Sequence, residues 1–493
     1  MSGVGSYALR VGLIGAIDAA LLSDILGRLA AILPPGPGPV TLRLLHRAGA
    51  VAGVPPGWTA CSLTEAPGGD ATMVIVRNVD VLVAAGDPAG ALAEPVAAAL
   101  LLGVPVLCLS PGPLRLLTDR FWMLTPAPAL VGDPAFSALR DRLAALLTPP
   151  PGPVPAALRQ FEAGLRLSDR ALWRAHRAAL NLLARTPRHA TREAPPALGW
   201  WSPAYATADA LANAYADRYR SSYTVVLVLA ALALIVAVLG LRTAHHWPVA
   251  IMEALCLAGI VALVRANMRL DWRSRMIQCR LLAELCRKQA ALAFVGRSLP
   301  AAGIAMLARA GGLDWIGWRF AAAVRAAPLP TSTAGDGSLA AARDASAAVL
   351  LQGQRTYHAA RVALGRQREA ALVLAGQVVF GCTVLFVLVK LGLLLAGQEH
   401  GAEWAGLAAA LLPAIAAAVF GFRAYAELEL LVQQSERLVA VIEDAEASLA
   451  RIDPAAAGAA RAIGDVLEEA AVAMLADVGG WIQISRVKAV EAG

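Results

Sequence analysis

Four apolar stretches constrain this chain more than any other feature of its sequence. Three of them, residues 224–241, 370–389 and 404–422, carry no charged residue, and the fourth, residues 249–264, carries one, Glu253. A helix that crosses a bilayer needs about 20 mainly apolar residues. In a soluble protein, such runs would form helices that are apolar on every side. The sequence therefore predicts four transmembrane helices.

The composition supports a membrane protein. Hydrophobic residues make up 58% of the 493 residues and charged residues 16%, and the mean hydropathy is +0.59. A soluble domain has about 45–50% apolar and about 25% charged residues. The net charge of +7 is typical of basic residues that flank membrane helices on the cytoplasmic side and does not indicate nucleic-acid binding. We expect the lipid bilayer, and no nucleic acid, as a partner.

The connections between the apolar stretches predict two hairpins and their orientation. Residues 242–246 join the first pair and residues 397–403 the second, and the second link has no Lys or Arg. The other flanks are basic, with Arg218, Arg220, Arg265, Arg269, Arg273, Arg275, Arg280, Arg287, Lys288, Arg355, Arg361, Arg366, Arg368 and Arg423. Lys and Arg accumulate on the cytoplasmic side. We therefore predict a multi-pass protein of the bacterial inner (plasma) membrane, with both termini cytoplasmic and no cleaved signal peptide.

Residues 1–126 show the alternation that is typical of an α/β domain. Strands are predicted at residues 11–15, 40–45, 73–76, 79–84 and 103–109, and helices at residues 21–29 and 94–102. Strands that alternate with helices predict a parallel sheet with crossover helices. The predicted fold class is an α/β Rossmann-like soluble domain plus an all-α membrane domain with four transmembrane helices in two hairpins.

Proline-rich segments and the hairpins divide the rest of the chain. The predicted parts are residues 127–203, a linker (near 149–153) and an amphipathic helix; 204–297, the first hairpin with its cytoplasmic arms; 298–338, a connector ending in a flexible linker at 331–338; 339–452, the second hairpin with its arms; and 453–493, a C-terminal helix. The order of arm, hairpin and arm therefore occurs twice.

The end of the first predicted strand is a candidate ligand site. Gly12, Gly15 and Asp18 lie there. A glycine turn at this point would let a phosphate approach the backbone N–H groups of a helix N-terminus. The alternative is a tight strand–helix turn with Asp18 as the helix N-cap, and it is favoured because no complete GxGxxG motif is present.

A second group of candidates, Gly86, Asp87 and Glu94, follows a neighbouring strand and borders the same crevice. A carboxylate there would accept hydrogen bonds from a ribose or act as a nucleophile, which makes Asp87 and Glu94 the catalytic candidates. The alternative is a turn residue and a first-turn Glu that the helix dipole favours.

Other motifs for chemistry are absent from the sequence. The six cysteines form no CxxC pair, His245 and His246 lack further ligands, and no Ser-His-Asp set, P-loop or HExxH occurs. We predict free thiols, no metal and no cofactor other than a nucleotide-like ligand. The basic arm at residues 265–288 is interpreted as a solvated orientation signal rather than a lipid-headgroup site, with Arg280, Glu284 and Arg287 in intrahelical ion pairs.

The hairpin arms also carry family motifs, namely ADRYRSSY at residues 216–223, CRLLAELCR at 279–287, QRTYH at 354–358 and QSER at 434–437. These segments resemble the SLATT family of two-helix membrane domains found beside bacterial conflict systems. The N-terminal region resembles SLOG-type Rossmann-like domains, which are related to nucleoside deoxyribosyltransferases. That resemblance implies residues 79–84 as the central strand, Glu94 as the acidic residue of the following turn and residues 103–106 as the next strand. Gly15-Ala16-Ile17 and Gly90-Ala91-Leu92 depart from the family's Gly-His-Arg and Gly-Gly-Thr.

Three functional hypotheses follow. The first is an inner-membrane effector, in antiviral defence, whose cytoplasmic nucleotide-sensing domain controls membrane-spanning hairpins. Small residues at 408–410, 414 and 416–418 favour close helix packing and hence a homo-oligomer. The alternatives are a membrane-anchored enzyme that cleaves a nucleoside or related N-glycosidic bond, and a scaffold whose degenerate head binds only protein.

Overall fold

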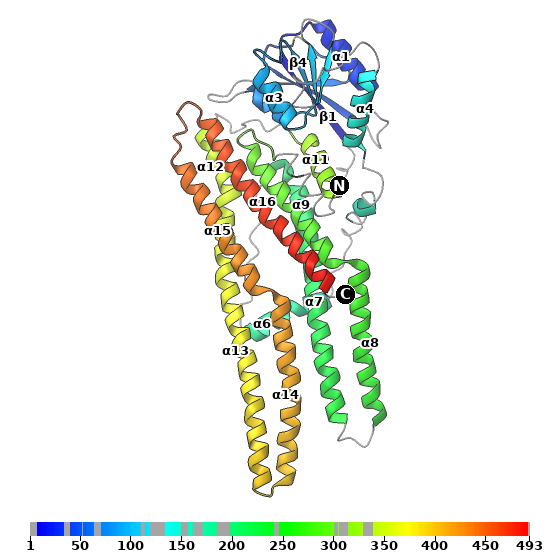
Figure 1. Ribbon diagram of the computed structural model, residues 1–493, viewed down its shortest axis with the longest axis vertical. Helices are drawn as coiled ribbons and strands as arrows, with labels where there is room; N and C mark the ends of the chain where they lie inside the picture. The colour runs from blue at the N-terminus through cyan, green and yellow to red at the C-terminus, as the bar shows by residue number, and fades with distance from the viewer. Residues whose placement is uncertain are drawn as a thin grey trace.

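The computed structural model describes residues 7–33, 40–51, 53–63, 71–109, 114–118, 134–148, 156–159, 161, 171–184, 198–240, 246–299, 304, 314–328 and 339–491, of which residues 134–138, 246 and 477–491 are described by their backbone alone. The linkers predicted near residues 149–153 and at 331–338 lie outside this part, as does His245. An α/β head lies at one end of an elongated helical body, and two helical hairpins extend from the other end (Figure 1).

The head is built on one six-stranded sheet. Its strands are β1 (Tyr7–Gly15), β2 (Val40–Arg47), β3 (Trp58–Leu63), β4 (Val81–Ala85), β5 (Val106–Leu109) and β6 (Arg115–Leu117). The order is β3-β2-β1-β4-β5-β6, and every pair is parallel except β5–β6. This Rossmann-like order confirms the predicted parallel α/β fold. Strands β3 and β6 were not predicted.

Helices cover both faces of the sheet. They are α1 (Ala19–Ala31), α2 (Ala71–Arg77), α3 (Ala93–Leu101) and α4 (Pro134–Leu147). On β4, Val81 and Val83 pack with α1 and α4, whereas Leu82 and Ala84 pack with α2 and α3. Both faces are buried, which explains why the strands are apolar throughout. Helix α4 therefore belongs to the core of the head, although it lies beyond residue 126.

One predicted strand is wrong. Residues 73–76 belong to helix α2, which packs its buried Ile75 and Val76 against the sheet. A short apolar run rich in Val and Ile satisfies a buried strand and one face of a short helix equally well. Here the run supplies the crossover between β3 and β4, so tertiary packing decides in favour of the helix.

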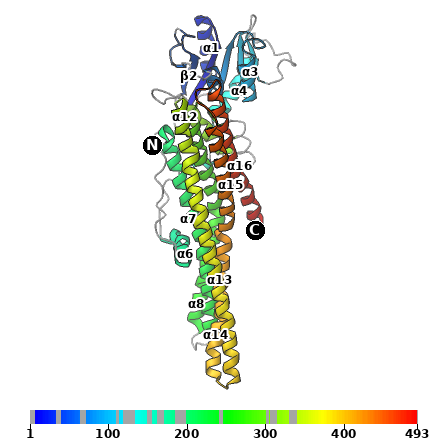
Figure 2. The same cartoon turned by 90° about the vertical axis from the view of Figure 1, so that its left-hand side faces the viewer.

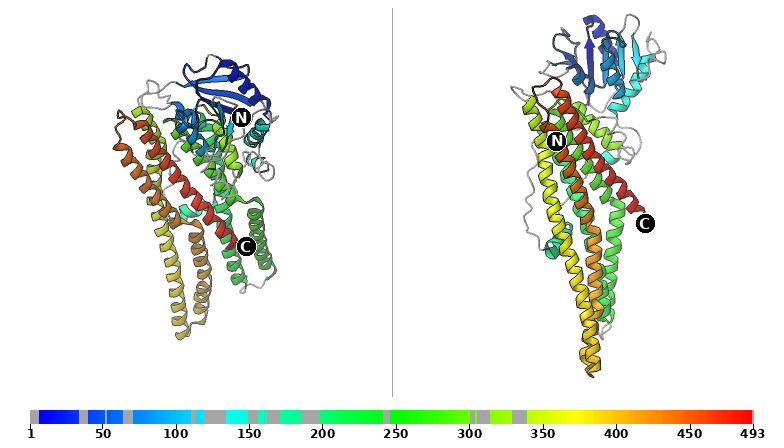
Figure 3. Two further views of the ribbon diagram at one scale, coloured as in Figure 1. Left: turned by 45° about the horizontal axis from the view of Figure 1, so that its top comes forward. Right: turned by 60° about the vertical axis from the view of Figure 1, so that its left-hand side comes forward.

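In the helical body, the order of arm, hairpin and return arm occurs twice. Its elements are η1 (Ala171–Arg174), α6 (Ala175–Ala184), η2 (Gly199–Trp201), α7 (Ser202–Gly240), α8 (His246–Leu270), α9 (Trp272–Ala293), α11 (Asp314–Ala326), α12 (Leu339–Ala347), the π-helical turn η3 (Ala348–Gln352), α13 (Gly353–Leu395), α14 (Glu399–Ala426), α15 (Leu428–Ala450) and α16 (Ala459–Glu491). Helices α7 and α8 form one hairpin and α13 and α14 the other, and α9 and α15 return toward the head (Figures 1 and 2). Helix α16 crosses the arms obliquely (Figure 3).

Four helices are long and apolar enough to cross a membrane: residues 199–240, 247–270, 339–395 and 399–450. In the most apolar window of the third, 0% of the residues are buried inside the protein, and in the second 6%. An apolar surface of this extent is unfavourable in water and favourable in lipid. The predicted four spans are therefore present as helices, and their exposed faces suit contact with a bilayer.

Candidate functional site

The sheet has its topological switch point between β1 and β4. Gly15 pairs with Ala85 in the parallel register, so both strands end at the same edge. From this point the chain order runs outward in opposite directions, to β2 and β3 on one side and to β5 on the other. In doubly wound sheets, ligands bind in the crevice outside the carboxyl ends of the strands at such a point.

The structure places Gly15 and Asp18 at this edge in structural roles. Gly15 has φ +84°, and a Cβ built there would lie 2.0 Å from the carbonyl oxygen of Ala85. Asp18 caps α1, because its Oδ1 accepts hydrogen bonds from the backbone N–H groups of Ala20 (2.9 Å) and Leu21 (3.2 Å). The close approach of the strands explains the glycine, and Asp18 acts as the predicted N-cap.

Gly86, Asp87 and Glu94 lie at the same edge. Gly86 directly follows β4 with φ +149°. Asp87 Oδ1 accepts a hydrogen bond from Ala89 N–H (3.0 Å), and Glu94 is in the first turn of α3. Both carboxylates are exposed. The structure therefore brings these residues and the β1 end together, and their ligand binding stays a prediction.

Gly12 is not at the crevice. It is buried within β1, and a Cβ built there would lie 2.6 Å from Ile75 Cγ2 of α2. This glycine allows α2 to approach the sheet closely. It contributes to packing of the head rather than to its edge.

The opposite, amino-terminal edge of the sheet is docked on the helical body. The guanidinium groups of Arg10 and Arg43 both donate to the carbonyl oxygen of Ala327, just after α11. Asp80, ahead of β4, accepts a hydrogen bond from Arg10 N–H (2.9 Å). The carboxyl-terminal edge of the sheet, where the ligand crevice is predicted, consequently faces away from the hairpins, with α1 at the far end of the molecule (Figure 1).

These docked charges are desolvated. The Arg10 side chain is 1% exposed, and burial lowers its pKa to about 10, although Asp80 opposes the shift. Burial raises the pKa of Asp80, while Arg325 and Arg10 act in the other direction. Separating the head from α11 would remove the Ala327 carbonyl oxygen from Arg10 and the charge of Arg325 from Asp80, which is costly for buried charges.

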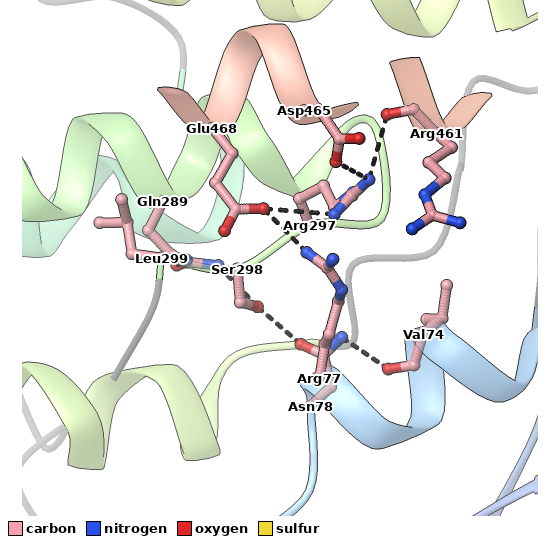
Figure 4. A network of polar contacts seen from close by, with 10 residues as sticks. All are labelled: Val74, Arg77, Asn78, Gln289, Arg297, Ser298, Leu299, Arg461, Asp465 and Glu468. Atoms are coloured by element: carbon pink, nitrogen blue, oxygen red, sulfur yellow. Dashed lines mark hydrogen bonds and ion pairs between the residues drawn. The ribbon is translucent and has the colours of Figure 1, made fainter. Parts of the chain in front are cut away.

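A second polar contact joins the head to α9 and α16. Glu468 accepts hydrogen bonds from Arg77 (2.8 Å) and Arg297 (3.3 Å), and Arg297 also contacts Asp465 (2.7 Å) (Figure 4). Beside them, Ser298 Oγ donates to Asn78 Oδ1 (2.7 Å). The end of α2 is thereby tied to the turn after α9 and to the first part of α16. We call these residues the head–arm network.

Sequence reasoning identified neither the contacts of Arg10 nor the head–arm network. The available signals were isolated charges in apolar surroundings, such as Arg10 within β1 and Asp80 beside β4. Such charges are rarely left inside a core unless they are paired. Partners across the interface are distant in sequence, since Arg10 and Ala327 lie 317 positions apart, so no local pattern could identify them.

The two hairpins meet their return arms at matching breaks. Asp271, between α8 and α9, has φ 44°, and Glu427, between α14 and α15, has φ 49°. Both are left-handed conformations that non-glycine residues rarely adopt. Glu427 forms an ion pair of 3.7 Å with Arg273, two residues after the other break. The breaks therefore lie close together where the hairpins leave the arms.

Among the described residues, no group of three or more His, Cys, Asp and Glu side chains is placed to hold a metal ion. The free cysteines Cys279 and Cys286 are buried in α9, and burial raises the pKa of each thiol to about 12. Thiols held in this protonated form are poor nucleophiles.

A scan against protein-family models and searches of curated proteins and of solved structures found no match to this chain. The structure itself shows a mostly parallel α/β head with a Rossmann-like strand order, followed by long apolar helices.

Proposed function

We propose that this chain is a multi-pass inner-membrane effector in which the head senses a nucleotide-like ligand and controls the two hairpins. The observation that carries the proposal is the docking of the amino-terminal sheet edge on the helical body, through Arg10, Arg43 and the head–arm network. A shift of the head would change these contacts and would therefore act on α9, α11 and α16 of the helical body.

A series of contacts joins the carboxyl-terminal edge of the sheet to the membrane hairpins. Strands β1 and β4 share one edge at their carboxyl ends, where the ligand is predicted, and β1 is docked on the body through Arg10 toward its amino end. The turn just beyond the end of α9 contacts the head through Ser298, and the other end of α9 adjoins the break at Asp271. A ligand that favours one position of the head would thereby favour one arrangement of the hairpins.

The membrane part of the proposal rests on the exposed apolar helices and their basic flanks. The arms, with their arginines, lie on the same side of the hairpins as the head (Figure 1), which supports a cytoplasmic head and cytoplasmic termini. The small residues of α14 support a homo-oligomer. The resemblance to SLOG and SLATT domains supports a role in antiviral defence.

The geometry favours the effector over an enzyme. Asp87 and Glu94 are both exposed, and Asp87 is hydrogen-bonded within its own turn. Catalytic carboxylates more often lie in water-excluding pockets that tune their protonation.

The test is membrane integrity in a bacterial host that expresses the full chain. We expect loss of membrane potential and uptake of an impermeant dye, and we expect Ala16→Arg, which places a long side chain at the crevice, to change this response. Ala31→Arg is the matched control, because Ala31 is an exposed alanine at the other end of α1. Intact membranes under all inducing conditions would refute the effector, and equal behaviour of the two variants would refute sensing at the crevice.

A further inference from the structure

The helical body contains a partly open cavity that no residue of the head lines. It has a volume of about 180 Å³ and lies between the arms of the two hairpins, α7 and α9 on one side and α13 and α15 on the other. The charged residues that line it are Arg220, Arg280, Arg287, Lys288, Arg361 and Glu284. We call it the arm cavity. Five cationic side chains thus face a single carboxylate.

The ion pairs of the cavity leave this excess uncompensated. Glu284 is shared by Arg280 (3.3 Å), Lys288 (2.9 Å) and Arg287. Asp209 adds a second carboxylate, which contacts Arg280 at 2.8 Å. Three cations therefore share two carboxylates as ion-pair partners.

Two further cations come from the other sides of the cavity. The ion pairs of the described residues join neither Arg220 nor Arg361 to a carboxylate. Asp217 and Glu427, whose charges act on Arg220, form their own ion pairs with Arg177 and Arg273. The contact of Arg361 is with the Tyr357 hydroxyl, at 3.4 Å.

Two of the five cations that line the arm cavity are almost completely buried. Arg287 and Lys288 are each 1% exposed, so the prediction of a solvated arm is wrong at these positions. Within the described part of the chain, Arg287 Nη1 has no hydrogen-bond partner. Burial lowers the pKa of Lys288 to about 8 against the effect of Glu284. Burial would raise the pKa of Glu284, but Arg287, Lys288 and Arg280 together hold it well below its usual range.

We propose that the arm cavity binds the phosphate group of an anionic ligand and so holds the arms of the two hairpins together. Buried cations are costly unless they are paired and hydrogen-bonded. Guanidinium groups offer planar forks of donors that match phosphate oxygens. Arg220 and Arg287 come from the first hairpin's arms and Arg361 from the second's, so one bound anion bridges the two. This site does not depend on a ligand in the head.

The rest of the cavity suits the body of such a ligand. Gln354, Tyr357 and Gln434 add polar and aromatic groups, and Met276 and Leu438 add apolar walls. Arg220 lies four residues before the apolar run that starts at Thr224, and Arg361 lies nine before the one at Ala370. At 1.5 Å per residue these cations are about 6 and about 14 Å from the apolar runs. A lipid phosphate and a soluble phosphorylated molecule can both reach that level.

The experiment uses the purified full chain with two probes. The first is inorganic pyrophosphate added to the protein in neutral detergent, against chloride at the same ionic strength. The second is reconstitution into nanodiscs of phosphatidylglycerol or of phosphatidylcholine. Thermal unfolding and titration calorimetry are the readouts. The variants are Arg361→Gln and Arg220→Gln, on different helices, and the matched control is Arg355→Gln, on α13 but outside the cavity and paired with Glu446.

We expect stabilisation by at least one probe and affinity weakened about tenfold or more in both cavity variants, since each removes a charged hydrogen-bond donor. The control variant should stay within about twofold, because exposed ion pairs contribute little. A response to pyrophosphate identifies a soluble phosphate ligand, and a response to phosphatidylglycerol alone identifies a lipid headgroup. Wild-type protein that responds to neither probe, or equal losses in Arg355→Gln and the cavity variants, overturns the proposal. If one cavity variant does not fold, the response of the wild-type protein and the affinity of the other variant still test whether the arm cavity binds phosphate.

Discussion

Removal of Glu468 is the most direct test of the docking between head and arms. Glu468→Ala takes away the acceptor that Arg77 and Arg297 share. Arg297 keeps Asp465 at 2.7 Å and the carbonyl oxygen of Arg461 at 3.1 Å. The loss therefore falls mainly on Arg77, which connects α2 of the head to α16.

The magnitude follows from the geometry. The three side chains are only 26% (Arg77), 9% (Arg297) and 23% (Glu468) exposed. At 2.8 Å and an effective dielectric constant of about 20, the Coulomb energy of the Arg77–Glu468 pair is about 6 kcal/mol, most of which desolvation offsets. Hydrogen bonds to charged groups contribute about 1.5–3 kcal/mol net. We expect the free energy of opening the interface to fall by that amount.

Hydrogen–deuterium exchange of the full chain measures this opening. A loss of about 1.5–3 kcal/mol should accelerate exchange about tenfold to hundredfold in peptides that cover α2 and the first turns of α16, because about 1.4 kcal/mol corresponds to a factor of ten. The matched control is Glu469→Ala, the same substitution one position along on the exposed side of α16. Unchanged exchange in α2, or equal acceleration in both variants, would refute the coupling.

Three further outcomes are expected. Gly15→Ala should lower the free energy of unfolding by about 2 kcal/mol or more, because φ is +84° and the new Cβ meets the Ala85 carbonyl oxygen at 2.0 Å. The control is Gly27→Ala in α1, where a Cβ meets nothing within 4 Å. In the same thermal melts, this substitution should raise the free energy of unfolding by about 0.5–1 kcal/mol. Sulfate, which keeps its charge from pH 7 to 9, should bind the arm cavity more weakly as pH rises through about 8, because Lys288 loses its proton there. The other charged and titratable groups that face it are Arg220, Arg280, Arg287, Arg361, Glu284, Tyr357 and His358. Calorimetry at constant ionic strength measures the affinity, and pH-independent binding would exclude a role for Lys288. An impermeant maleimide should label Gln398→Cys in intact cells and Ala456→Cys only after lysis, and the reverse pattern would contradict the cytoplasmic head.

Local sequence patterns were sufficient for the elements that depend on local chemistry. The four apolar stretches became helices with exposed apolar faces, because an uncharged run of that length suits lipid wherever it occurs in the chain. The strand periods and the turns at Gly15 and Gly86 gave the central strands β1 and β4 and their common edge. The Asp18 cap was predictable as well, since an N-cap bonds only to the next few residues.

Tertiary structure alone decided the features that join distant residues. Residues 73–76 became a helix because the crossover between β3 and β4 required one. The bond between Ser298 and Asn78 spans 220 positions, and the arm cavity collects cations from three helices. Arg287 and Lys288 look like solvated flank charges in sequence and are buried in the fold. Burial and pairing depend on which surfaces meet, and that is set by packing of the whole chain rather than by any short segment.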